Sequence, residues 1–405
     1  MSSYDAIVAG AGPAGSTAAR ALSQGGASVL LLDKHSFPRD KPCGGGVTLR
    51  AASVQDLDLS SVIERTICGA RFSLRLGRSF DRRFHQPLTY MTQRCRLDEH
   101  LARRAAASGA DFHDGEGVRS VETTGREGAG RRGLTVRTVN GSYTAGVLIG
   151  ADGANGVTAR AAGLQPCLEE AVALEGNIPF KPDIPTDWRD YVGLDLGGLA
   201  GGYGWVFPKA DHLNLGVGAW KYAGFTLRPK LAELSRRYGF DPATLENLRG
   251  HHLPIRIPGS PIARGPVALA GDAAGLIDPL SGEGIHMAFA SGRLAAEHAM
   301  RYLSGESESM DGYERAVDAE LQPELDISRR LQEVFHFAPP PYLALMRRSE
   351  KFWLFFCHLI RGELTYLDFV RMIGPLRIAL DYFADVARRR REAKVAALTP
   401  LLRSA

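Results

Sequence analysis

Apolar residues near the N-terminus fall into short runs that predict a strand, a tight turn and a helix. Residues 6–9 form an uninterrupted apolar run and lead directly into Gly10-x-Gly12-x-x-Gly15. An alanine-rich stretch follows, which predicts a helix to about residue 22. A second apolar run, residues 27–32, predicts another buried strand and ends at Asp33. The start of the chain is therefore expected to be a β-α-β unit.

Two later apolar runs end in the same way, with glycine and an acidic residue. Residues 145–149 predict a strand that leads into Asp152-Gly153, and residues 267–270 predict one that leads into Gly271-Asp272. After Gly284 the pattern predicts a helix of about twenty residues. Residues 66–92 and 166–260 alternate between apolar and polar positions, as strands of a second, antiparallel domain would. The last hundred residues predict helices with breaks at Pro323, at residues 339–341 and near Pro375.

The glycine pattern of the first turn has a physical reason. Gly10 permits the sharp turn, Gly12 lets the backbone approach a pyrophosphate, and Gly15 lets helix and strand pack closely. The phosphates would meet free N–H groups at the positive end of the helix, and Asp33 would accept a hydrogen bond from a ribose hydroxyl. This unit predicts a dinucleotide site, but it does not distinguish NAD from FAD.

Composition narrows the setting. The 405 residues, 44% of them hydrophobic, are enough for two or three domains with an ordinary core. The five cysteines are scattered and lack metal-ligand spacing, and no signal peptide is evident, so a reducing cytoplasm is expected. His251, His252 and His286 also lack metal-ligand spacing, so no metal is expected. Nothing in the sequence predicts nucleic-acid binding.

The C-terminal region carries the positive charge. Of the net charge of +4, residues 347–405 contribute +6 and the rest of the chain contributes −2. This region also holds the apolar run of residues 352–360, which is much shorter than the roughly 20 residues that span a bilayer. Two interpretations stay open. The tail lies on the inner face of an anionic membrane, or it is a helical region that packs on the rest of the protein with a solvated basic face.

The three strand ends occur in the order seen in FAD enzymes of the para-hydroxybenzoate hydroxylase fold, and this resemblance favours FAD. Residues 41–46 (Lys-Pro-Cys-Gly-Gly-Gly), 203–208 (Tyr-Gly-Trp-Val-Phe-Pro) and 279–285 (Pro-Leu-Ser-Gly-Glu-Gly-Ile) further resemble the geranylgeranyl reductase family. The implied fold is mixed α/β. It consists of a Rossmann-like FAD-binding domain (1–65, 93–165 and 260–305), an interleaved antiparallel-sheet substrate domain (66–92 and 166–259) and a helical C-terminal region (306–405).

The resemblance also implies a set of FAD-binding residues. Glycines 10, 12 and 15 with Asp33 would hold the ADP half, Arg94 would lie against the pyrophosphate, and Asp272 would contact the ribityl chain. Composition alone would instead leave the basic helix start at Arg94 solvated. The helix after Gly284 would point its N-terminus at the pyrimidine edge of the flavin, where reduction leaves negative charge. The full expected set is Gly10, Gly12, Pro13, Ala14, Gly15, Asp33, Lys34, Cys43, Gly44, Gly45, Arg94, Asp152, Gly271, Asp272, Gly282, Gly284 and Ile285.

The family's reaction implies roles for the other motifs. Its members reduce carbon–carbon double bonds in prenyl chains, and the expected mechanism is hydride from flavin N5 to one alkene carbon and a proton to the other. Cys43 is the candidate proton donor, with an inert packing role as the alternative. The implied substrate-binding residues are Tyr203, Trp205, Phe207 and Pro208, which would line an apolar tunnel or would simply be sheet core. Glu283 is expected to be a structural hydrogen-bonding group.

The substrate is expected to be a prenylated lipid, diphosphate, quinone or tetrapyrrole, and the electron donor NADPH or reduced ferredoxin. The alternative enzyme is a flavin-dependent monooxygenase or halogenase of the same fold that acts on a small or apolar substrate. Halogenases carry a Trp-x-Trp-x-x-Pro type of signature, whose first tryptophan is replaced here by Tyr203. A different class is a peripheral membrane flavoprotein that only carries electrons.

Overall fold

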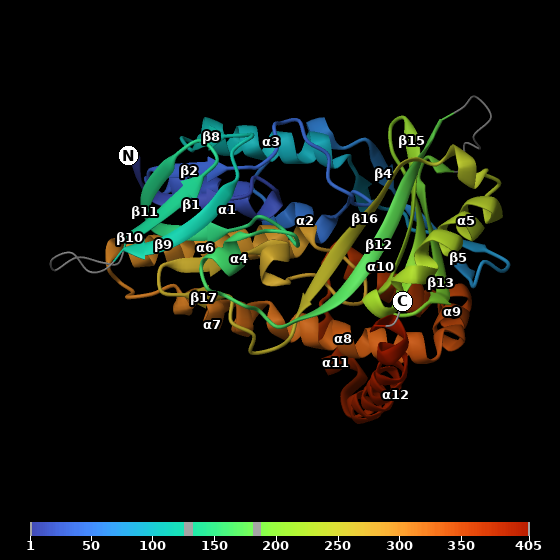
Figure 1. Ribbon diagram of the computed structural model, residues 1–405. Helices are drawn as coiled ribbons and strands as arrows, with labels where there is room; N and C mark the ends of the chain where they lie inside the picture. The colour runs from blue at the N-terminus through green and yellow to red at the C-terminus, as the bar shows by residue number, and fades with distance from the viewer. Residues whose placement is uncertain (1, 125–132, 181–187, 404–405) are drawn as a thin grey trace.

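A computed structural model of the chain describes residues 2–124, 133–180 and 188–403. Figure 1 shows one sheet with its helices at one end of the molecule and a second sheet at the other, with the C-terminal helices along one side. This is the mixed α/β architecture that the sequence predicts.

The first sheet has eight strands, with β17-β18-β11-β1-β2-β8 in spatial order and β10 and β9 continuing from β11. Strands β8, β2, β1, β11 and β18 run parallel. The strands are β1 (Ser2–Ala9), β2 (Val29–Leu32), β8 (Asp111–His113), β9 (Val118–Thr124), β10 (Gly133–Thr138), β11 (Ser142–Gly150), β17 (Ala263–Arg264) and β18 (Val267–Leu269). Strand β2 begins two residues later than predicted, because residues 27 and 28 complete the turn that follows helix α1.

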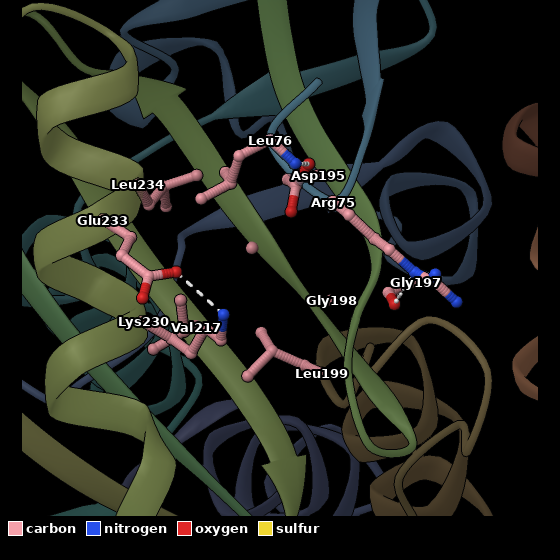
Figure 2. A pocket seen from close by; sticks show the side chains of 11 residues that line it. Arg75, Leu76, Asp195, Gly197, Gly198, Leu199, Val217, Lys230, Glu233 and Leu234 are labelled. Atoms are coloured by element: carbon pink, nitrogen blue, oxygen red, sulfur yellow. Dashed lines mark hydrogen bonds and ion pairs between the residues drawn. The ribbon is translucent and has the colours of Figure 1, made fainter.

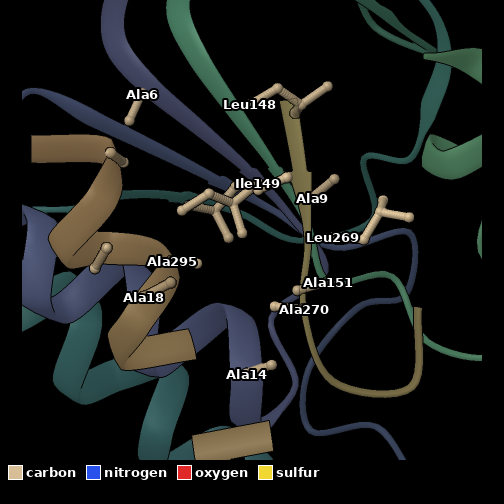
Figure 3. Packing of buried hydrophobic residues seen from close by; sticks show 14 of the residues in the cluster. Ala6, Ala9, Ala14, Ala18, Leu148, Ile149, Ala151, Leu269, Ala270 and Ala295 are labelled. Carbon is tan, nitrogen blue, oxygen red and sulfur yellow. The ribbon is translucent and has the colours of Figure 1, made fainter. Parts of the chain in front are cut away.

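Helices cover this sheet through small residues. They are α1 (Pro13–Gln24), α3 (Arg94–Ala107), α4 (Thr158–Ala161) and α6 (Ile285–Ser304). Ala14 and Ala18 of α1, Ala295 of α6, and Ala6 and Ala9 of β1 belong to one buried apolar cluster (Figure 3). A Cβ added at Gly292 would stand 2.3 Å from the carbonyl oxygen of Ala14, so α1 and α6 approach backbone to backbone. The alanines and glycines of these helices therefore serve close packing.

The second sheet has seven strands in the order β16-β12-β15-β14-β13-β5-β6, antiparallel except for the β13–β5 pair. They are β5 (Gly69–Leu74), β6 (Phe80–Arg83), β12 (Leu168–Pro179), β13 (Tyr191–Leu199), β14 (Gly202–Pro208), β15 (His212–Trp220) and β16 (Glu246–Arg256). Helix α5 (Leu227–Arg237) packs Leu231 and Leu234 against Val206 of β14 and its neighbours. Since side chains alternate along a strand, Tyr203, Trp205 and Phe207 lie on the opposite face of β14.

A third sheet of three strands joins the two halves. It consists of β3 (Gly46–Thr48), β7 (Thr89–Met91) and β4 (Arg65–Ile67), with β7 in the centre. Residues 66–92, predicted to belong wholly to the substrate domain, thus divide between this sheet and the second sheet. Strands of three residues are too short for their alternation to identify a sheet. The short helix α2 (Leu49–Val54) follows β3 directly.

The C-terminal region is helical, as predicted. It contains α7 (Asp311–Glu320), α8 (Gln322–Phe337), α9 (Pro339–Arg348), α10 (Glu350–Arg361), α11 (Tyr366–Ile373) and α12 (Arg377–Arg403). Pro323 and Pro339 stand in the first turns of α8 and α9, where a missing N–H is tolerated. Within the described part of the chain, no helix is long and apolar enough to cross a membrane.

The apolar run of residues 352–360 lies on α10, where it packs on the rest of the protein, as one of the two open interpretations expects. Trp353 and Cys357 are fully buried and join a cluster with Phe72 of β5. The Phe72 ring meets that of Trp353 edge to face at 6.3 Å. One face of this run is therefore buried in the protein, and its other side chains are partly exposed.

Candidate active site

The carboxyl ends of the parallel strands meet at one edge of the first sheet, and the predicted nucleotide turn lies there. Gly10 has φ +100°, and a Cβ on it would stand 2.3 Å from the carbonyl oxygen of Ala151. A Cβ on Gly15 would stand 1.8 Å from the carbonyl oxygen of Gly10. Both positions require glycine for backbone geometry or packing. Pro13 and Ala14, also predicted to bind the cofactor, form the buried first turn of α1.

Gly12 is different, because its backbone is in an ordinary conformation with φ −79°. The nearest neighbours of a Cβ at Gly12 would be two guanidinium groups, Arg39 at 3.5 Å and Arg94 at 3.9 Å. The space above Gly12 thus faces two cations and the N-terminus of α1. An anionic diphosphate such as the pyrophosphate of FAD fits this donor set.

Arg39 and Arg94 are held by two acidic residues. Arg94 makes a bidentate contact with Asp98, with both N–O distances at 2.8 Å, and Arg39 bridges Asp98 at 2.8 Å and Asp33 at 3.2 Å. Arg94 is only 5% exposed, so the composition-based expectation of a solvated helix start is wrong for this residue. Arg39 was not predicted. Its position in the loop beside Asp33 was the only signal available.

Three further predicted residues differ in burial and in their hydrogen bonds: Asp33, Lys34 and Asp152. Asp33 is buried and accepts a hydrogen bond from the Ala11 N–H at 2.9 Å, which ties the end of β2 to the glycine turn. Lys34 is exposed and is not brought into the cluster around Gly12. Asp152 accepts from the N–H groups of Val157 and Thr158 at 2.7 and 2.9 Å and so caps the start of α4. Its backbone packs beneath Gly10. Asp152 therefore supports the glycine turn from behind.

Asp272 connects three distant segments. Its carboxylate forms an ion pair with Lys41 at 2.7 Å and lies 3.8 Å from His251. A Cβ on Gly284, just before α6, would stand 3.3 Å from Asp272 Oδ1. Burial alone would raise the pKa of Asp272, but the charge of Lys41 and the nearby His251 ring outweigh burial and hold the pKa well below its usual range. Gly271 has φ +59° and donates its N–H to Ser291 Oγ at 3.0 Å.

The predicted glycine loop lies against the predicted aromatic strand. A Cβ on Gly44 would stand 2.7 Å from the Phe207 ring and 3.3 Å from the indole nitrogen of Trp205. Gly45 has φ +66° and donates its N–H to Cys43 Sγ at 3.3 Å. Because residues 44 and 45 are glycines, the loop backbone can lie close to the side chains of the second sheet. Cys43 is only partly buried.

The aromatic side chains of β14 form a row. Neighbouring ring centroids are 6.1 Å apart between Tyr203 and Trp205 and 6.2 Å apart between Trp205 and Phe207. The Trp205 indole donates to Asn214 Oδ1 at 2.8 Å, and the Tyr203 hydroxyl donates to the carbonyl oxygen of Ser281. Pro208 is buried at the end of the strand. The structure thus joins the three motifs of residues 41–46, 203–208 and 279–285.

The turn that starts α6 is closed by Glu283. Gly282 has φ +70°, and a Cβ there would stand 3.9 Å from the Tyr203 hydroxyl. Glu283 accepts a hydrogen bond from the His286 N–H at 2.6 Å, which agrees with the expected structural role. Ile285, the first residue of the helix, is buried. Burial raises the pKa of Glu283 from 4.5 to about 7, so the neutral carboxyl predominates in the folded protein below pH 7.

We expect Glu283→Gln to change the pH dependence of stability. Because the folded pKa of Glu283 lies above its unfolded value, its stabilising contribution is complete below pH 4.5 and is lost as pH rises through about 7. Glutamine stays neutral. Relative to the natural protein, the variant should gain about 2 kcal/mol of unfolding free energy between pH 5 and pH 8.

Urea unfolding at both pH values measures this difference, with the exposed-residue variant Glu170→Gln as the control. His286, whose pKa burial lowers to about 4, titrates in both proteins and cancels in the difference. A pH-independent difference would contradict the prediction.

A cavity lies on the other face of β14, away from the glycine loop (Figure 2). Its charged groups have partners in the protein: Lys230 pairs with Glu233 at 2.7 Å, and buried Asp195 accepts from Ser73 Oγ at 2.6 Å and from the Leu76 N–H at 2.7 Å. Leu76 has φ +59°, so Asp195 holds a left-handed turn in place. None of the predicted site residues lines this cavity.

Among the residues that the structure describes, no group of three His, Cys, Asp or Glu side chains could hold a metal ion.

The sequence is similar to known proteins. Residues 3–193 match a family described as an FAD binding domain. The chain is 33% identical over 311 residues to a geranylgeranyl diphosphate reductase of Rhodobacter capsulatus, covering 74% of this chain and 76% of the relative. It is 30% identical over 376 residues to digeranylgeranylglycerophospholipid reductase 1 of Methanopyrus kandleri, covering 82% of this chain and 93% of the relative.

Solved structures share the fold. A geranylgeranyl bacteriochlorophyll reductase-like protein of Thermoplasma acidophilum superposes with a TM-score of 0.74 at 24% identity, over 92% of this chain and 100% of the other. A triple mutant of a flavin-dependent brominase superposes with a TM-score of 0.71 at 18% identity, over 96% of this chain and 100% of the other. The fold is thus common to reductase-like and halogenating flavoproteins and does not by itself separate them.

Proposed function

The chain belongs to the geranylgeranyl reductase family of FAD-dependent oxidoreductases, and on this premise we propose that it saturates carbon–carbon double bonds in a prenyl chain. The observation that carries the proposal is the contact between the Cys43–Gly45 segment and the aromatic row of β14. Backbone without side chains lies here beside a thiol and aromatic rings. A flat flavin ring and an apolar chain require such surroundings.

The residues of this chain divide the work of the proposed reaction. Arg39, Arg94 and the N-terminus of α1 would bind the pyrophosphate, and Asp272 would bind the ribityl chain. FAD, once reduced, supplies the hydride. Cys43 would hold a proton at Sγ and deliver it to the alkene carbon that does not receive the hydride, so that the double bond becomes a single bond and the thiol becomes a thiolate until solvent returns the proton.

Apolar packing around Cys43 would keep water away from this step. The thiol lies at the edge of a cluster that contains Val47, Leu97, Ile285 and Phe289, each at most 5% exposed. An isolated alkene accepts hydride poorly, so the acid must be close and competing water must be excluded. Tyr203, Trp205, Phe207 and Pro208 would continue this apolar surface along the prenyl chain.

An anaerobic oxidation experiment tests the proposed function. The FAD-loaded protein is reduced with dithionite and mixed with geranylgeranyl diphosphate, a geranylgeranylated lipid, a menaquinone or a prenylated tetrapyrrole. Flavin reoxidation with a product mass gain of two hydrogens per bond supports the proposal and identifies the head group. Reduction of the flavin by NADPH or by reduced ferredoxin identifies the donor. If only oxygen reoxidises the flavin, the monooxygenase or halogenase interpretation replaces the reductase.

The C-terminal helices offer a surface for a lipid-dissolved substrate. Exposed apolar side chains occur close together at the α11–α12 junction: Met372 is 63% exposed, Leu376 68% and Ile378 71%. Arg371 and Arg377 lie among them and are exposed. Farther along α12, Arg391 pairs with Glu333 at 2.7 Å and Glu169 at 3.0 Å, which fastens the helix to the body. We propose that this junction, rather than α10, docks on the cytoplasmic face of an anionic membrane.

We expect the double variant Leu376→Ser/Ile378→Ser to bind vesicles about tenfold more weakly, because two apolar side chains would no longer enter the interface. The measurement is cosedimentation with vesicles of anionic phospholipid. Phe225→Ser is the matched control, since Phe225 is also 71% exposed but belongs to a different segment. Equal sedimentation of the double variant and the natural protein would show that the α11–α12 junction does not dock on the membrane.

A further inference from the structure

Two charged side chains from the second sheet contact the backbone on either side of Cys43. Glu175 of β12 accepts a hydrogen bond from the Cys43 N–H at 2.8 Å, over a separation of 132 residues. Lys209, which follows β14, donates to the carbonyl oxygen of Gly44 and to that of Thr92, the latter at 2.9 Å. The glycine loop is thus gripped at two consecutive residues by the sheet that would carry the prenyl chain.

These contacts are built into the fold. Lys209 is only 2% exposed, and a Cβ on Gly45 would stand 2.4 Å from its ammonium nitrogen, so Gly45 leaves room for the lysine. The Thr92 N–H donates to the carbonyl oxygen of Gly45 at 2.9 Å, which closes the loop from the other side. Lysine is almost never fully buried unless its ammonium group has partners. We therefore interpret Lys209 as a residue that holds the two carbonyl oxygens in place.

Lys209 is buried and Glu175 is partly buried, and both side chains are ionised at an energetic disadvantage there. Burial raises the pKa of Glu175 to about 7 and lowers the pKa of Lys209 to about 8. The two charges favour each other, and Asp40 also faces Glu175 while Cys43 and Glu64 face Lys209. Keeping two ionisable groups in such a place is unfavourable for folding alone. The two groups lie against the loop that holds the Cys43 thiol.

We infer that Glu175 and Lys209 are positioning residues that clamp the Cys43–Gly45 backbone and fix the direction of the Cys43 thiol. The inference rests on the proposed function, in which that thiol delivers the proton. Neither side chain need touch the substrate. Each acts through the loop: Glu175 on the peptide that precedes the thiol, and Lys209 on the carbonyl that follows it.

The test compares variants of the FAD-loaded protein in two measurements. Glu175→Leu removes the acceptor, Glu175→Gln keeps an amide oxygen in its place, and Lys209→Met removes the donor. Hydrogen exchange of the peptide spanning residues 41–46 should become at least tenfold faster in Glu175→Leu and Lys209→Met and stay within threefold in Glu175→Gln. With geranylgeranyl diphosphate, kcat for alkene reduction should fall at least tenfold in the first two with KM within threefold, and Glu175→Gln should retain most of kcat. Glu170→Gln, on the same strand but paired with Lys221, is the control.

Exchange at the natural rate in Glu175→Leu, with FAD retained, would overturn the inference. If Glu175→Leu does not fold, Lys209→Met decides the question by the same criterion. Equal losses of kcat in Glu175→Gln and Glu175→Leu would also overturn it, because a clamp requires only the acceptor. Failure of the natural protein to reduce any prenyl compound would refute the proposed function, whereas the exchange measurement would still test the clamp.

Discussion

Replacing Gly12 by alanine is expected to abolish FAD retention while leaving the fold intact. The backbone at Gly12 accepts any residue, and a Cβ there meets no protein atom closer than 3.5 Å. The methyl group would nevertheless stand between the N-terminus of α1 and the guanidinium groups of Arg39 and Arg94, where the pyrophosphate is expected. We expect FAD to bind at least about a hundredfold more weakly, on the order of 3 kcal/mol. Gly15→Ala should instead damage the fold, because its Cβ would meet backbone at 1.8 Å.

The measurements for Gly12→Ala are flavin content after purification, the FAD dissociation constant and thermal unfolding of the FAD-free protein. Gly141→Ala is the matched control, since an added Cβ there meets nothing within 4 Å. A Gly12→Ala protein that purifies with the natural flavin content would show that the phosphates lie elsewhere.

Cys43→Ala is expected to remove alkene reduction without removing FAD. Loss of a positioned general acid lowers the rate by roughly 10²- to 10⁴-fold. The thiol is partly buried beside the apolar cluster, so water would be a poor replacement donor. Anaerobic reoxidation of the reduced flavin by geranylgeranyl diphosphate should slow by that factor, while reoxidation by oxygen should be unchanged.

Cys167→Ala serves as the control for Cys43→Ala, because Cys167 is an exposed free thiol. If the rate of Cys43→Ala stays within a few-fold of the natural rate, Cys43 is a packing residue. Proton delivery would then have to come from another group near the glycine loop.

The sequence predicted the parts of the fold that depend on local patterns. An apolar run followed by a glycine turn is a property of neighbouring residues, and so the Gly10–Gly15 turn and the strand ends at Asp33, Asp152 and Asp272 were all found. The predicted twenty-residue helix after Gly284 is α6. The burial of Arg94 could not be predicted from composition. The structure shows that Arg94 forms a buried ion pair with Asp98, one helical turn later.

Contacts between distant residues could not be predicted in this way. Lys41 meets Asp272 over 231 residues, and Cys43 meets Glu175 over 132. Periodicity shows which face of a strand is buried but not which charged side chain of another strand reaches it. The single residues Arg39, Glu175 and Lys209 carry no motif of their own. Their roles can be recognised only from the contacts that they make in the folded protein.

The strand order of the first sheet also dictates how late the protein can fold during synthesis. Strand β11 can pair with its parallel neighbour β18, from Leu148 with Val267 onward, only when about two-thirds of the chain has been made. Until then α6 is also missing, so the nascent chain on the ribosome exposes the apolar edge and face that these elements later cover. Parallel pairing over such a separation closes slowly. The nucleotide site therefore cannot be completed until β18 and α6 have been made, and FAD can bind only after the substrate sheet has been translated.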